Sequence, residues 1–88
     1  MIVGDIGTVI QADTGESLSG GSDAVLFYRK PSGEAGEWAA TIDGTKITYA
    51  TIAGDLDEAG VWSFQGHVVL SGWTGRTGVF TEAVDTAI

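Results

Sequence analysis

Few residues in this 88-residue sequence could do chemistry. It contains no Cys and a single His, His67, so it offers no thiolate nucleophile, no disulfide, no cysteine zinc site and no histidine metal cluster. Ser63 or Ser71 could be combined with His67 and an Asp into a hydrolase triad, but the G-x-S-x-G motif is missing and such residues occur together by chance in most chains. We therefore predict no catalytic residue, no cofactor and no enzyme activity, and interpret His67 as a surface histidine.

Three acidic residues stand close together at Asp55, Asp57 and Glu58. Their carboxylates could offer oxygens to a calcium ion, but the EF-hand pattern of alternating ligands that ends in Glu is missing. We favour a solvated corner, in which Asp57 accepts hydrogen bonds from backbone amides of its own turn. The sequence therefore predicts no metal site.

Trp73 lies in a segment whose glycines are spaced three apart, at Gly72, Gly75 and Gly78. This spacing matches neither the P-loop nor the dinucleotide-binding fingerprint, and it is typical of a flexible hairpin. Trp73 either folds back onto its own domain or serves, together with Arg76, as an anchor for a protein partner, because Trp and Arg are enriched at interface hot spots. Stacking on a sugar is another use of an exposed Trp, so a carbohydrate-recognition module on a phage or bacterial surface is the second interpretation.

The charge balance excludes several partners. Twelve acidic and four basic residues give a net charge of −8, which leaves little for phosphate binding, and we expect no nucleic acid and a basic partner surface. The apolar runs are far shorter than the roughly 20 residues that cross a bilayer, so we expect no membrane span. Met1 is followed directly by apolar residues without the basic segment and cleavage site of a signal peptide, and we expect synthesis in the cytoplasm.

The elements that would position these residues are strands. Abundant Val, Ile, Thr and Gly favour pleated strands and turns, and Gly interrupts every helical period. The expected strands are residues 1–12, 24–30, 37–43, 45–51, 61–70 and 77–84. Short strands at this spacing indicate an all-β sandwich of two antiparallel sheets, with about six to eight strands and little or no helix, in a single domain spanning residues 1–88.

Alternation predicts which side chains face the core. The clearest strand, residues 61–70, is expected to direct four large side chains inward: Trp62, Phe64, Val68 and Leu70. In the last strand, Val79 and Phe80 compete for the inward face. The first and last strands are the expected sheet edges, and residues 85–88 are expected to fray.

Two connections carry further expectations. Leu18, in the loop of residues 14–23, is expected to plug one end of the sandwich. Asp43 and Gly44 are expected to form the two-residue turn of a hairpin.

Four motifs resemble the small immunoglobulin-like domains of tailed-bacteriophage structural proteins and are similar to the N-terminal domain of phage baseplate upper proteins. They are VGDIGT at residues 3–8, KPSG at 30–33, EW at 37–38 and AGDLDEAGVW at 53–62. Trp38 would occupy the core Trp position of such a sandwich, and Trp62 stands where a tyrosine corner has Tyr.

The resemblance implies a virion structural protein, made in the host cytoplasm, that acts through contacts with other virion proteins. We expect several copies in a symmetric assembly, as a baseplate, tail or neck adaptor or as a capsid decoration protein. Baseplate proteins of that kind continue into a receptor-related region, whereas this chain is expected to be free-standing.

Overall fold

The structure is a computed structural model that describes residues 1–70 and 72–86, without the side chain of Trp73. This part of the chain is all-β, as predicted. Its eight strands are β1 (Val9–Asp13), β2 (Ser22–Arg29), β3 (Ala35–Ala39), β4 (Thr41–Asp43), β5 (Lys46–Ala50), β6 (Gly60–Leu70), β7 (Trp73–Arg76) and β8 (Phe80–Val84). No helix in the described ranges is long and apolar enough to span a bilayer.

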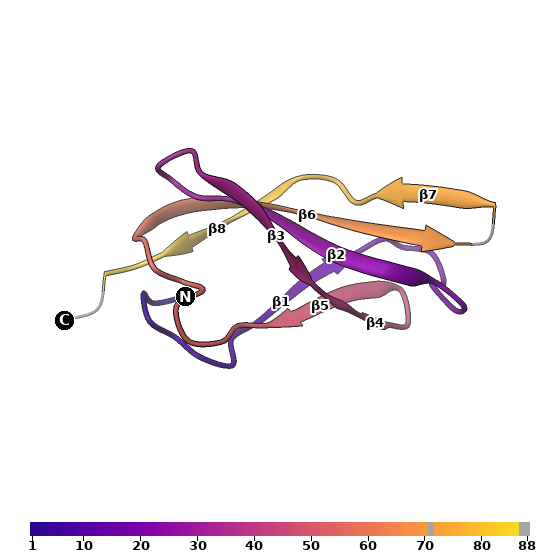
Figure 1. The fold of residues 1–88 in the computed structure, drawn as a ribbon, viewed down its shortest axis with the longest axis horizontal. Coiled ribbons are helices and arrows are strands. Elements are labelled where there is room, and N and C mark those ends of the chain that lie inside the picture. Colours follow the sequence, from indigo (N-terminus) through magenta and orange to yellow (C-terminus); the bar gives the residue numbers. More distant parts are fainter. Residues whose placement is uncertain (71, 87–88) are drawn as a thin grey trace.

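The strands form two antiparallel sheets (Figure 1). One sheet has three strands in the order β1-β5-β4, and the other has five, with β3-β2-β6-β7 in a row and β8 also paired to β6. If β1 is taken as strand B of an immunoglobulin sandwich, this order corresponds to B-E-D facing C′-C-F-G. The predicted sandwich of two antiparallel sheets is confirmed.

The core lies between the sheets and is built from the inward positions of alternating strands. Its buried side chains are all at most 2% exposed, and they include Ile10, Leu26, Ile47, Trp62, Phe64 and Val68. The predicted inward face of β6 is therefore correct, and Leu70 packs against this core as a partly buried side chain. Leu18 is fully buried, which confirms its role as a plug.

The expected single strand at residues 37–43 is divided between the two sheets. Its first part belongs to β3 in the five-stranded sheet and its second part is β4 in the three-stranded sheet. The chain crosses at Ala40, whose N–H donates to the carbonyl of Ala24 at 3.0 Å. Trp38 therefore lies on an edge strand and is half-buried, whereas Trp62 on β6 is fully buried.

The end of the chain differs from the predicted flexible hairpin and last strand. Residues 73–76 form β7, and both β7 and β8 pair with β6, one beyond the other along its length (Figure 1). The inward face of β8 is settled, because Phe80 packs on Phe64 with ring centroids 5.6 Å apart, whereas Val79 is 66% exposed. β1 and the β7–β8 side are sheet edges, as expected.

Three local predictions need correction. Only the Val9–Asp13 portion of the expected first strand is a strand, and before it Ile2 bridges in parallel to Asp85. Asp85 is held there by its N–H, which donates to the Met1 carbonyl at 2.8 Å, so fraying does not begin at residue 85. In the β4–β5 hairpin the closing pair is Asp43 and Lys46, which moves the two-residue turn one position onward to residues 44–45.

Candidate functional site

The residues that carry the four motifs are used largely inside the fold. The turn between β2 and β3 packs against the corner before β6, where Lys30 Nζ lies 2.9 Å from Asp57 Oδ2 and Ser32 donates its hydroxyl to Glu58 at 3.0 Å. The hydrogen bond that Lys30 donates to Asp57 is the main cause of the raised pKa of Lys30. Gly60 closes the corner with φ +132°, and a Cβ at this position would lie 2.6 Å from Cγ of Pro31. This corner holds β2, β3 and β6 together.

Trp62 takes over the hydrogen bond of a tyrosine corner. Its indole N–H donates to the carbonyl of Glu58, four residues upstream, at 3.0 Å. The ring is fully buried, and its centroid lies 6.2 Å from the ring centroid of Phe64 and 6.2 Å from that of Trp38. The Tyr-to-Trp difference in the motif therefore preserves a side-chain link from the strand back to its corner.

The acidic corner is organised differently from the prediction. Asp55 accepts the hydrogen bonds, from the backbone N–H of Ile52 at 2.8 Å and from the hydroxyl of Tyr49, whereas Asp57 pairs with Lys30. Burial, reinforced by the bond to Asp55, raises the pKa of Tyr49 to about 12. Among the described residues no cluster of His, Cys, Asp and Glu could hold a metal ion.

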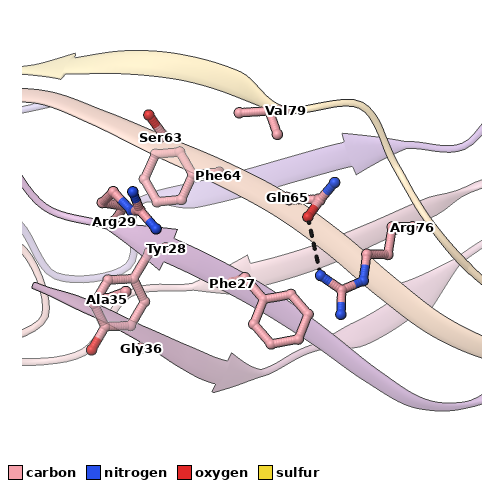
Figure 2. Close-up of a pocket in the computed structure, with 10 residues that line it drawn as sticks. All are labelled: Phe27, Tyr28, Arg29, Ala35, Gly36, Ser63, Phe64, Gln65, Arg76 and Val79. Atoms are coloured by element: carbon pink, nitrogen blue, oxygen red, sulfur yellow. Dashed lines mark hydrogen bonds between the residues drawn. The ribbon is translucent and has the colours of Figure 1, made fainter. Parts of the chain in front are cut away.

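An open groove of about 430 Å³ lies on the outer face of the five-stranded sheet, the face turned away from the core (Figure 2). It is lined by ten residues: Phe27, Tyr28, Arg29, Ala35, Gly36, Ser63, Phe64, Gln65, Arg76 and Val79. In register, Phe27 stands opposite Gln65, and Arg29 stands opposite Ser63. The groove thus combines an aromatic ring, two guanidinium groups and a neutral amide on neighbouring strands.

Arg76 lies over Phe27 in this groove. Its guanidinium carbon lies 4.9 Å from the centroid of the Phe27 ring, and Nη1 lies 3.5 Å from Gln65 Oε1 (Figure 2). Gln65 is held in turn, because its amide donates to the carbonyl of Thr77 at 3.0 Å. Thr77 bridges the gap between β7 and β8 by accepting the N–H of Gly66 at 2.8 Å. The break in the edge strand therefore positions the amide that meets Arg76.

Trp73 and Arg76, the two residues expected to form an interface anchor, are at the two ends of β7. Trp73 pairs with Leu70, and Arg76 pairs with His67. Arg76 lies on the groove face, where it lines the groove. The side chain of Trp73 is outside the described part of the chain, and its role stays a prediction.

The described structure does not bring Ser63 and His67 together. Ser63 and His67 share the outer face of β6 but are four positions apart, which corresponds to about 13 Å along a strand, and Ser71 is outside the described residues. The half-buried His67 ring meets Phe27 edge-on, with centroids 5.9 Å apart. Its buried Nδ1 has no hydrogen-bond partner in the described structure.

Sequence reasoning missed the groove residues Phe27, Arg29 and Gln65. The signal was present in the alternation of residues 24–30, which places Leu26 inward and Phe27 and Arg29 outward. An apolar run of this kind is typical of a central strand buried on both faces, and β2 is indeed central in its sheet. Its outer face, however, is only partly covered.

A second surface feature is an aliphatic patch, defined as Ile6, Val9 and Ile52. These side chains are 69%, 56% and 61% exposed. They lie at one end of the three-stranded sheet, where Thr8 and Thr51 join the two segments through a backbone hydrogen bond of 3.0 Å. The patch adjoins the open edge of β1.

Comparison of the chain with protein-family models found no match, and searches of curated proteins and of solved structures found none either. Function is therefore inferred from the residues of this chain.

Proposed function

We propose that this chain is a phage virion structural protein without enzyme activity, which acts through contacts with other virion proteins. It would serve as a baseplate, tail or neck adaptor or as a capsid decoration protein, and would be present in several copies in a symmetric assembly. The observation that carries the proposal of a contact function is the aliphatic patch beside the open edge of β1. Exposed apolar groups next to an unpaired strand edge favour binding of another chain.

The phage context rests on the resemblance of the four motifs. The contacts of these motifs support a structural role. Lys30 pairs with Asp57, Trp62 donates a hydrogen bond to the corner that precedes its strand, and Gly60 packs closely against a neighbouring turn. Residues used in this way are not free to bind a substrate. The surfaces left for contacts are the aliphatic patch, the sheet edges and the groove.

The test is incorporation into particles. A tagged chain would be produced in the host during particle assembly, and the particles would be purified by density gradient and analysed for stoichiometric copies. We expect Val9→Glu to reduce incorporation per folded molecule while leaving the melting temperature nearly unchanged. Val61→Glu is the matched control, since Val61 is 59% exposed on the other sheet.

Absence of the wild-type chain from particles would overturn the virion assignment. Equal incorporation of the two glutamate variants would remove the aliphatic patch as a contact surface.

The carbohydrate-recognition alternative is tested on a sugar array, to which the wild-type chain and a Trp73→Ala variant would be applied. Specific sugar binding that this variant loses, with incorporation unchanged, would favour the carbohydrate-recognition alternative.

A further inference from the structure

The four cations of this acidic chain divide into two groups. Lys30 faces three carboxylates, of which Asp57 is the nearest at 2.9 Å. Lys46 stands in register between two aspartates, on β1 and β4. Lys30 is therefore paired with carboxylates within the fold, and Lys46 stands beside two aspartates of its own sheet.

Arg29 and Arg76 form the other group. Within residues 1–70 and 72–86, every salt bridge involves Lys30, so neither arginine has a carboxylate partner in the described structure. Both line the same groove. In a chain with a net charge of −8, two unpaired guanidinium groups in one groove mark a local site of opposite charge.

We propose that this groove binds an extended acidic segment of a partner protein, with two carboxylates placed two residues apart, one on Arg29 and one on Arg76. This inference rests on the proposed contact function and names the chemistry of one partner. Arginine suits it because its planar fork binds carboxylates through two parallel hydrogen bonds.

The spacing follows from the strand geometry. The Arg76 guanidinium lies over Phe27, and Arg29 is two positions further along the same face of β2. Phe27 and Arg29 are alternate residues of β2 and so about 7 Å apart along the strand, and we place the carboxylates of an extended partner at the same spacing, at positions i and i+2. Glu37 stands opposite Phe27 on the β3 edge, and its charge directs the acidic segment toward the β6 side.

The experiment uses a defined peptide, acetyl-Ser-Thr-Glu-Thr-Glu-Thr-Ser-amide, titrated into the whole chain at physiological ionic strength and followed by amide NMR. One control is the isomer with the two Glu adjacent, which has the same charge but directs its carboxylates to opposite sides. The other replaces both Glu by Gln. We expect the first peptide to bind more tightly than either control and to shift the Gln65 and Arg76 amides.

Protein variants locate the contact. Arg29→Gln and Arg76→Gln should each weaken binding by at least about tenfold, because each loses hydrogen bonds between charged groups. Arg29→Lys should recover part of the affinity, since it keeps the charge but loses the fork. Lys46→Gln is the matched control, because it removes one positive charge from the other sheet and should leave binding unchanged.

Several results would overturn the proposal: no binding, equal binding of the adjacent-Glu isomer, or equal weakening by Lys46→Gln. The proposed function is separated by the particle assay. If the wild-type chain bound no peptide and an Arg29→Gln/Arg76→Gln variant still entered particles normally, the groove proposal would be refuted and the virion role would stand. Specific peptide binding by a wild-type chain that never enters particles would do the opposite.

Discussion

Replacement of Trp62 tests how the fold is stabilised. The side chain is fully buried, and its indole N–H donates to the Glu58 carbonyl at 3.0 Å. Trp62→Ala should lower the free energy of unfolding by about 3–5 kcal/mol, the range for deleting a large buried aromatic. Because the stability of a small domain starts at about 5 kcal/mol, this change removes most of it.

Trp62→Phe separates the hydrogen bond from the packing. The smaller ring keeps much of the aromatic stacking but leaves the Glu58 carbonyl without its donor, which should cost about 1–3 kcal/mol. Urea unfolding followed by far-ultraviolet circular dichroism measures both variants. The neighbouring Val61→Ala is the control, since Val61 is 59% exposed and should change stability by no more than about 0.5 kcal/mol.

Two results would contradict a buried, hydrogen-bonded Trp62. If Trp62→Phe unfolded with the wild-type midpoint, the bond to Glu58 would contribute nothing and the corner would depend on packing alone. If Trp62→Ala were as stable as Val61→Ala, the ring would not lie in the core.

Three further predictions concern the pH dependence, the corner and the interrupted edge. The pKa of Tyr49 is raised to about 12, above its usual value of about 10. Between these two pH values unfolding releases a proton, so the free energy of unfolding should fall as pH rises from about 10 toward 12. Urea midpoints measured across this pH range should fall less for Tyr49→Phe than for the wild type. Gly60→Ala should cost at least about 1–3 kcal/mol in thermal unfolding because of its positive φ, whereas Gly78→Ala, with open space around it, should not destabilise. Thr77→Val should cost about 1–3 kcal/mol by leaving the Gly66 N–H unpaired, and an unchanged melting temperature would count against that bond.

The inward faces could be predicted because a strand's side-chain period is local. Alternation in residues 61–70 identified Trp62 and Phe64 as core residues, and both are at most 1% exposed. The same alternation could not reveal that residues 37–43 change sheets at Ala40. Inward parity is preserved across the change, because Trp38 and Ile42 pack on the same core from opposite sheets.

Contacts between distant segments escaped prediction for a physical reason. The link between Lys30 and Asp57 joins residues 27 positions apart, and no local pattern indicates it. In the acidic corner, the carboxylate that accepts a backbone N–H is Asp55 rather than the predicted Asp57. The choice depends on Tyr49 on β5, the strand that precedes the corner, because its hydroxyl donates to Asp55.

Stability and binding are assigned to different faces of this domain. The corner around Trp62 is built on the inner face of the five-stranded sheet and at its end, where burial and internal ion pairs stabilise a small fold. Arg29 and Arg76 lie on the outer face and are exposed, so their removal takes little away from the core. Since the acidic remainder of the molecule repels other acidic chains, an attractive contact with an acidic partner has to be local. The groove over Phe27 is where the described structure concentrates the unpaired positive charge, and substitutions there should therefore change recognition without changing the fold.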